Sequence, residues 1–273
     1  MRRWRRIAIA ALLLGGTLGA GCATSPEGRR AGGDALARVR FTLVHVRDVR
    51  IAGPEDEGLE RLADAVGAIT TVDELDAVLL GPGLFAAPSS WQRTLEATLS
   101  VLSIVPAPVR PLFDPAELGD AQHREAALRA FEARHMLPRR ALSYGVDLGE
   151  GARLVVLGDE ADGGRAVLES ELRDSAAPVV VLAAREEPTA EPLRRLIARE
   201  RRIQCVLCAE PRPEGRPDDW PPVLVAPSLA ETERLRIVQV GAGAILSWTR
   251  PVFEGPAGRR LQRLLRRSEE SHP

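Results

Sequence analysis

The side chains of this chain that could hold a metal ion or transfer a proton are few and widely spaced. The chain has four histidines, at positions His45, His123, His135 and His272. Their spacing is not typical of a metal-ligand set. A site built from imidazole and carboxylate groups is conceivable, drawn from His45, Asp48, Asp159, Glu160 and Glu210. The chain contains no Asn, so an Asn amide oxygen is not available as a ligand. We expect no bound metal or cofactor, and expect Asp48 to be a loop carboxylate held in an ion pair or turn.

Two cysteines have the spacing of a redox pair, Cys205 and Cys208. They lie in an apolar run that predicts a strand, where residues three apart point to opposite faces. We therefore expect two buried thiols and not a disulfide. Gly81-Pro-Gly83 predicts a rigid turn and not a phosphate-binding loop, because no Lys and no Ser or Thr follows at the required places.

Composition indicates one domain with a sizeable core. The chain has 273 residues, 45% of them hydrophobic and 27% charged, and its formal net charge is -1. This balance gives no reason to expect binding to nucleic acid. All 37 basic residues are Arg.

The N-terminal residues are typical of a targeting segment. Several arginines precede an apolar run from Ile7 to Leu14, which is too short to span a bilayer, and small residues then lead to Cys22. Residues 1–22 resemble a bacterial lipoprotein signal, with Cys22 as the lipidated residue; the alternative is an ordinary secretory signal. Residues 23–38 are rich in Gly, Ala and Arg and predict a flexible tether. We expect a lipid-anchored protein of the cell envelope, with Ala23 favouring the outer membrane and a periplasmic orientation.

The C-terminal residues 255–273 predict a basic amphipathic helix and tail. Leu261, Leu264 and Leu265 fall at helical spacing among five arginines. Such a helix could lie on an anionic membrane or a partner, or its leucines could dock on the domain.

Between these ends, residues 39–254 alternate short apolar runs with amphipathic stretches, which predicts an α/β domain. The predicted strands cover residues 41–46, 77–80, 101–105, 141–147, 153–157, 178–183, 203–208, 223–226, 235–240 and 244–248. Helices are predicted near residues 59–69, 91–99, 117–134, 166–173 and 192–202. Four prolines between Pro106 and Pro115 predict an extended loop and argue against a central strand there.

This order resembles the calcineurin-like metallophosphoesterase family. The resemblance is carried by the apolar runs with their following loops and by residues 141–157, ALSYGVDLGEGARLVVL, which look like the hairpin after the family's third motif. It implies a four-layer α/β/β/α sandwich of two mixed sheets. It also implies a two-metal site at the strand ends, where Asp, His and Asn ligands would hold ions that activate water for phosphoester hydrolysis.

The motif positions of the family carry other residues here. In the first motif Asp48 remains, but Arg50 stands in the His place; in the second, Pro82 replaces the Asp. The third motif is matched by Pro108, Val109 and Arg110 in place of Asn, His and acid. The fourth His is matched by Ala184 or, with a slip of one residue, by Arg185. In the fifth, Glu210 and Arg212 stand in the two His places.

The resemblance therefore predicts the family's architecture without its metal centre. We expect a non-catalytic binding or structural module with a protein partner in the envelope. Two alternatives remain: a phosphoesterase with a rearranged site, and an anion sensor using Arg50, Arg110, Arg185 and Arg212. Acidic residues lie among these arginines, so we favour an ion-pair network over an anion site.

Overall fold

The structure is a computed structural model and describes residues 39–88, 90–148, 151–158, 163–211, 220–241 and 245–252. The predicted signal with Cys22, the tether and the C-terminal tail lie outside the described residues. So do Asp159, Glu160 and Arg212.

The first sheet, sheet 1, has the strand order β10-β9-β1-β2-β3. Its strands are β1 (Val39–Val46), β2 (Ala77–Leu80), β3 (Val109–Pro111), β9 (Arg234–Gly241) and β10 (Ile245–Pro251). The strands β1, β2 and β3 are parallel, whereas β9 is antiparallel to both β1 and β10. The carboxyl ends of β1, β2 and β3 therefore meet at one edge of the sheet.

The second sheet, sheet 2, has the strand order β4-β5-β6-β7-β8. Its strands are β4 (Tyr144–Leu148), β5 (Ala152–Leu157), β6 (Val179–Glu186), β7 (Ile203–Glu210) and β8 (Val223–Val225). The pair β4 and β5 is the predicted hairpin, and β5 to β8 run parallel.

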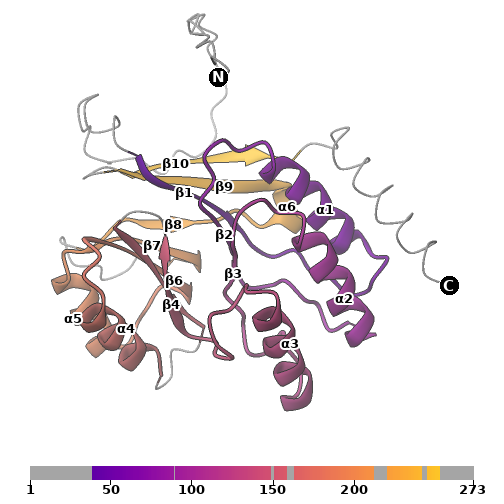
Figure 1. Cartoon of the computed structure of the whole chain (residues 1–273), viewed down its shortest axis with the longest axis horizontal. Coiled ribbons are helices and arrows are strands. Elements are labelled where there is room, and N and C mark those ends of the chain that lie inside the picture. The colour runs from indigo at the N-terminus through magenta and orange to yellow at the C-terminus, as the bar shows by residue number, and fades with distance from the viewer. Residues whose placement is uncertain are drawn as a thin grey trace, which may run out of the picture. The chain divides into compact units, whose positions relative to one another are not determined.

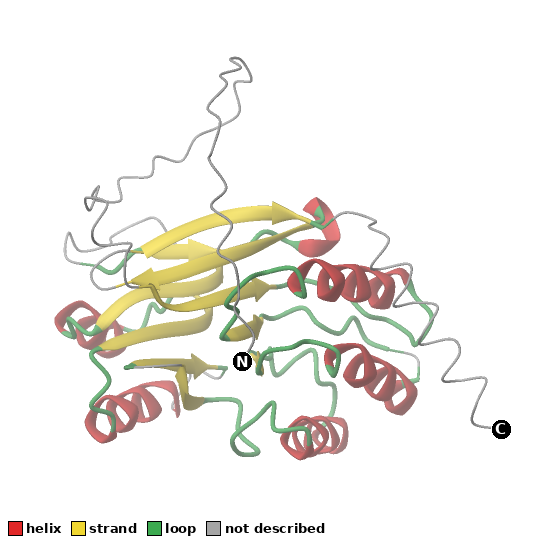
Figure 2. Cartoon of the chain, turned by 45° about the horizontal axis from the view of Figure 1, so that its top comes forward, coloured by secondary structure: helices red, strands yellow, loops and turns green. Residues whose placement is uncertain are grey.

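The helices lie on the outer faces of the two sheets (Figures 1 and 2). Those near sheet 1 are α1 (Glu57–Ile69), α2 (Trp91–Leu102) and α3 (Ala121–Ala133); those near sheet 2 are α4 (Gly163–Asp174) and α5 (Glu191–Arg199). A short helix, α6 (Leu229–Thr232), follows β8. The expected fold class, an α/β sandwich of two mixed sheets with outer helices, is confirmed.

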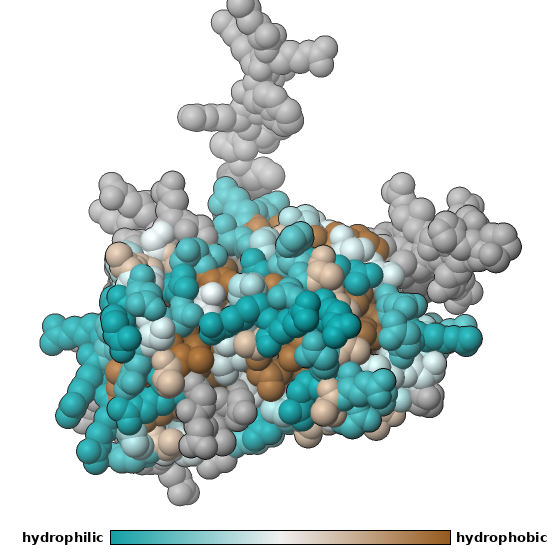
Figure 3. Space-filling view, turned by 60° about the horizontal axis from the view of Figure 1, so that its bottom comes forward, coloured by the Kyte–Doolittle hydropathy of each residue, from teal (hydrophilic) through white to brown (hydrophobic). Residues whose placement is uncertain are grey.

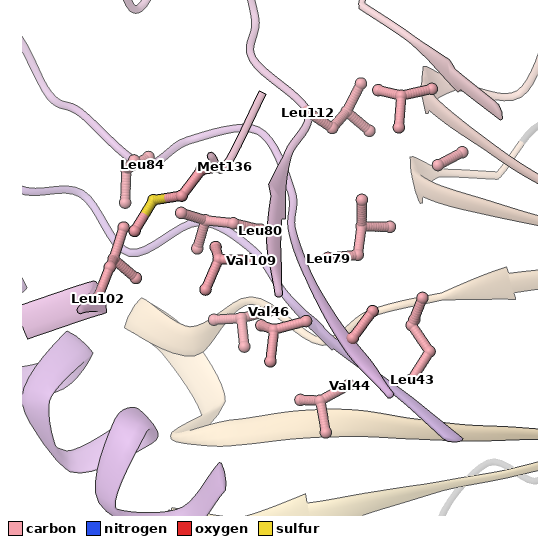
Figure 4. Packing of buried hydrophobic residues seen from close by; sticks show 14 of the residues in the cluster. Leu43, Val44, Val46, Leu79, Leu80, Leu84, Leu102, Val109, Leu112 and Met136 are labelled. Carbon is pink, nitrogen blue, oxygen red and sulfur yellow. The ribbon is translucent and has the colours of Figure 1, made fainter. Parts of the chain in front are cut away.

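Alternation of side chains along the strands of sheet 2 explains the layers. In β6, Val179, Val181 and Ala183 belong to the large core cluster that also contains the apolar side chains of sheet 1. The residues between them belong to a second cluster, together with Leu168 of α4 and Ile197 of α5. Each strand of this kind is buried on both faces, which accounts for its continuous apolar sequence. Figure 4 shows the part of the large cluster where Leu80 and Val109 approach Leu102 of α2.

One predicted strand is wrong. Residues 101–105 form the end of α2 and the turn after it, while the strand lies at β3 within the proline-rich segment. The helical pattern of α2 simply continues through Val101 and Leu102, both of which are buried. Pro111 has no backbone N–H to donate. An edge strand tolerates this, because no further strand pairs with its outer side. The helix α6 was not predicted, since four residues give too little periodicity.

The surface of the described part is mixed. Figure 3 shows hydrophilic residues over most of one face, with hydrophobic residues in smaller areas between them. Within the described residues, no helix combines the length and apolar character needed to cross a bilayer.

Candidate functional site

The carboxyl ends of strands from both sheets are joined by main-chain contacts. Arg47, directly after β1, forms a parallel bridge with Ser228, which lies between β8 and α6. The Arg47 side-chain Nε also donates to the Ala226 carbonyl at 2.5 Å. The loop after β1 in sheet 1 therefore lies beside the segment after β8 in sheet 2.

The loops after β1 and β2 continue to pair beyond their strands. The Asp48 amide donates to the Pro82 carbonyl and the Arg50 amide to the Gly83 carbonyl, both at 2.9 Å. Asp48 and Arg50 have positive φ angles of 56° and 61°, which are uncommon for residues other than Gly. Pro82 contributes its carbonyl to this arrangement and has no side-chain ligand to offer.

Asp48 is held in an ion pair. Its Oδ1 lies 2.7 Å from Arg50 Nε, its Oδ2 lies 2.9 Å from Arg50 Nη2, and the Ser228 hydroxyl donates to Oδ2. Arg50 also reaches Glu231 Oε1 at 3.3 Å. Partial burial raises the pKa of Asp48, but hydrogen bonds from Arg50 and Ser228 outweigh it, so the net pKa lies below its usual value.

The third loop lies further along the chain than the sequence predicted. Pro108 precedes β3, while Val109 and Arg110 lie within it. The Arg110 side chain contacts the turn after α3. Its Nη1 donates to the carbonyls of His135 at 2.8 Å and Met136 at 3.2 Å. The predicted third-motif residues are therefore not in the loop after the strand, where Asp114 is found instead.

Of the two residues expected at the fourth motif position, Arg185 faces sheet 1 and Ala184 faces the helices α4 and α5. Ala184 is fully buried in the cluster beneath α4 and α5, whereas Ala183 faces sheet 1, and Arg185 follows it on the same face. Arg185 Nη1 lies 3.0 Å from Asp114 Oδ2 and Nη2 lies 2.8 Å from Glu186 Oε1. This side chain connects β6 to the loop after β3.

The fifth position offers a carboxylate without an imidazole. Glu210 ends β7, is exposed, and stands in register with Glu186 at the end of β6. Its carbonyl accepts from the Glu187 amide at 3.1 Å. The two cysteines of β7 are buried and form no disulfide, as the sequence predicted.

Glu117 is a site residue that the sequence analysis missed. Its Oε2 accepts from the amides of Leu84 at 2.6 Å and Phe85 at 3.3 Å, and Oε1 accepts from the Asp114 amide at 2.8 Å. The carboxyl therefore joins the loop after β2 to the loop after β3. Burial raises its pKa to about 7, against the opposing effect of these hydrogen bonds. The spacing of Asp114 and Glu117 matches a capping box, a signal that could have indicated this contact.

His45 is enclosed in β1 just before the first loop. It is fully buried, and neither ring nitrogen has a hydrogen-bond partner among the described residues. Burial lowers its pKa to about 3, with smaller contributions from the charges of Arg47 and Arg236. A Cβ on Gly81 would lie 2.8 Å from His45 Nε2, so this ring fills the space beside the second loop.

The donor set of these loops does not fit a two-metal centre. Among the described residues, no three His, Cys, Asp or Glu side chains are grouped so that they could hold a metal ion. Arg50 and Arg185 stand beside the carboxylates that remain, and a guanidinium is a donor without a lone pair for a metal. Both arginines are bound to carboxylates, and Arg110 donates to carbonyls in the turn after α3.

Comparison with known proteins gives structural likenesses alone. No protein-family profile matches the chain, and no curated protein matches its sequence. A dimetal phosphatase from Danio rerio is 10% identical with a TM-score of 0.46; the match covers 79% of this chain and all of that one. A hypothetical protein from Thermus thermophilus is 14% identical with a TM-score of 0.48, covering 77% of this chain and all of that one. A purple acid phosphatase from yellow lupin is 11% identical with a TM-score of 0.43, covering 62% of this chain and 37% of that one. At these identities the likenesses carry no information about activity.

Proposed function

We propose that this protein is a non-catalytic, metallophosphoesterase-like lipoprotein that serves as a binding or structural module of the cell envelope. The observation that carries the proposal is the pairing of Asp48 with Arg50. The one carboxylate that remains in the family's first motif is bound by the residue that stands in the imidazole place.

A guanidinium at this place provides positive charge without metal chemistry. In a two-metal phosphoesterase, cations draw carboxylates from several loops together and activate water. Here Arg50 neutralises Asp48, and Arg185 neutralises Asp114 from the opposite sheet. These arginines hold the loops together, but they have no coordination site for water or phosphate oxygen of the kind that a metal ion provides.

A metal assay combined with a hydrolysis assay tests the non-catalytic part. The full chain is purified in detergent, its Mn, Fe and Zn content is measured by mass spectrometry, and turnover of a generic phosphodiester is followed with each metal added. We expect less than one metal ion for every ten chains and no turnover above the metal-only blank. Stoichiometric metal with turnover that Asp48→Ala abolishes would establish the alternative, a phosphoesterase with a rearranged site.

The envelope location rests on the lipoprotein-like N-terminus. Cys22 follows a basic and apolar leader, and sixteen residues of tether composition separate it from the first strand at Val39. Such a tether would have a root-mean-square end-to-end distance of about 20–25 Å. Stable anchoring needs more than one acyl chain. Metabolic labelling with a palmitate analogue tests this proposal, and Cys22→Ala should lose both the label and membrane fractionation. Label retained in Cys22→Ala would contradict it.

A protein partner in the envelope is the most direct use of such a module. The protein offers an anchored fold whose strand-end loops are linked by ion pairs and main-chain bonds. Photocrosslinking from position Glu210, which is exposed at the strand ends, should give one discrete adduct in intact cells, whereas the same probe at Gln92 on the outer surface of α2 should not. Equal adducts from both positions would argue against a partner at the strand ends.

A further inference from the structure

The edge of sheet 1 carries an apolar surface that the described helices leave exposed. Leu246 and Trp248 of β10 are 40% and 42% exposed, and they are two of the three large hydrophobic side chains exposed among the described residues. They are two residues apart and therefore share one face of the strand. We call Leu246 and Trp248 the β10 patch.

On this face of sheet 1, the apolar side chains of β9 are buried, whereas those of the β10 patch are exposed. Trp248 is in register with Ile237 of β9, which lies on the same face and is 3% exposed. Figure 1 shows β10 at the outer side of the sheet, next to β9. One more apolar element beside α1 would complete the outer layer.

We propose that the C-terminal tail, residues 253–273, folds back on the β10 patch and buries it. The tail begins directly after β10, where Val252 is buried and its amide donates to the Glu233 carbonyl at 2.7 Å. Leu261, Leu264 and Leu265 have the spacing of one helix face. This spacing suits an apolar stripe that packs on Leu246 and Trp248.

The connection is long enough for the tail to reverse direction. Leu261 follows Val252 by nine residues, which span about 30 Å when extended. Trp248 precedes Val252 by four residues, or about 13 Å along the strand. The tail is attached at the end of β10. For a short flexible link of this kind, the effective concentration of the tail at the patch is in the millimolar range.

Charges around the end of β10 complement the arginines of the tail. Arg250 Nη2 donates to Thr71 Oγ1 at 2.8 Å, which places the turn after α1 beside this strand. That turn carries the exposed acids Asp73 and Glu74, and the exposed Glu233 lies against Val252. The tail has arginines at positions 259, 260, 263, 266 and 267. The β10 patch therefore offers an apolar surface for the leucines of the tail, and the acidic residues beside it offer opposite charges for its arginines.

Trypsin accessibility of the tail in the full chain tests the proposal. The double variant Leu246→Glu/Trp248→Glu should raise the rate of cleavage within residues 259–267 by about tenfold or more, since an undocked tail is open to the protease. The matched control is Ile104→Glu, which changes a 37% exposed apolar residue elsewhere and should leave the rate unchanged. Equal tail cleavage in all three proteins would overturn the proposal.

A disulfide experiment identifies the occupant of the patch without relying on those variants. With Leu246→Cys and Leu264→Cys in one chain, oxidation should give a monomer with an internal link. A covalent dimer would assign the patch to a second copy of the chain. Tail protection that appears only when vesicles of anionic phospholipid are added would assign it to a membrane. Either of these outcomes, or the absence of any link, would overturn the intramolecular assignment.

Discussion

The Asp48 carboxylate receives charge-assisted hydrogen bonds at both oxygens from Arg50, two residues further along the chain. Both residues lie in the left-handed backbone region, and their amides bind the loop after β2. The ion pair is therefore part of the loop conformation and not an incidental surface contact.

Removal of the Arg50 guanidinium should raise the pKa of Asp48. In Arg50→Ala, the Ser228 hydrogen bond remains, so the pKa should rise toward the ordinary value for Asp without a large loss of structure. The free energy of unfolding at pH 7 should fall by about 0.2–1 kcal/mol, as for other solvent-exposed pairs. Because the folded-state pKa is depressed, this contribution is present above the unfolded pKa and disappears as the pH falls through the folded one. Carboxyl-carbon NMR titration measures the shift, with Arg165→Ala as the control; an unchanged Asp48 titration would contradict the assignment.

Any side chain at Gly83 should destabilise the domain. Its φ is 82°, and a Cβ would lie 2.9 Å from the Cα of Asp48, a backbone atom that cannot move independently of its loop. Gly83→Ala should therefore lower the free energy of unfolding by about 1–3 kcal/mol, the usual range for backbone strain of this kind. Urea denaturation gives the measurement. Gly53→Ala is the matched control, since nothing lies within 4 Å of the Cβ it would add; similar losses in both variants would disprove the close approach.

Replacement of His45 by an apolar residue should make the domain less sensitive to acid. The folded pKa of about 3 lies below the unfolded value of 6.5, so folding keeps the ring neutral. Its contribution is fully present above pH 6.5 and is lost as the pH falls toward 3. His45→Leu should be close to neutral in stability at pH 7, because neither ring nitrogen has a hydrogen-bond partner among the described residues. At pH 5 the variant should be more stable than the wild type. Denaturation at both pH values tests this, with the partly exposed His123→Gln as the control. A variant that is strongly destabilised at pH 7 would indicate a partner for the ring.

The sequence predicted the strands well because each is a continuous apolar run bounded by polar residues or turns. The prediction for β2 agrees residue by residue with the structure, and β6 and β7 differ by a few residues at their ends. It failed at β3, where a three-residue edge strand with a proline carries almost no apolar signal. Val101 and Leu102 gave that signal instead, although they belong to a helix.

The candidate site was predictable in part for the same reason. Asp48 and Arg50 follow a strand that was located correctly, so their loop could be identified. The third position depended on the misplaced strand, which led to Arg110 in place of Asp114. To choose between Ala184 and Arg185, one must know which residues of β6 point toward sheet 1. A strand that is buried on both faces is apolar throughout, so its sequence does not show this. The contact of Glu117 with Leu84 joins residues 33 positions apart, and the capping-box spacing alone indicates only its local half.

Glu117 should make the stability of the domain fall as the pH rises through the weakly acidic range. Its folded pKa of about 7 lies above its ordinary value of 4.5, so the folded state binds a proton that the unfolded state has lost between these values. Stability from this group therefore declines from pH 4.5 to pH 7, by on the order of 3 kcal/mol, and is level above that range. His45 makes the stability rise with pH over part of the same range. The quantity to compare is therefore the difference in free energy of unfolding between wild type and variant at each pH. Glu117→Gln should remove this slope, measured by urea denaturation at half-unit pH steps, while the exposed Glu96→Gln should keep it. Parallel pH profiles for Glu117→Gln and the wild type would show that the buried carboxyl is ionised throughout, with its charge stabilised by the three backbone amides that join the two loops.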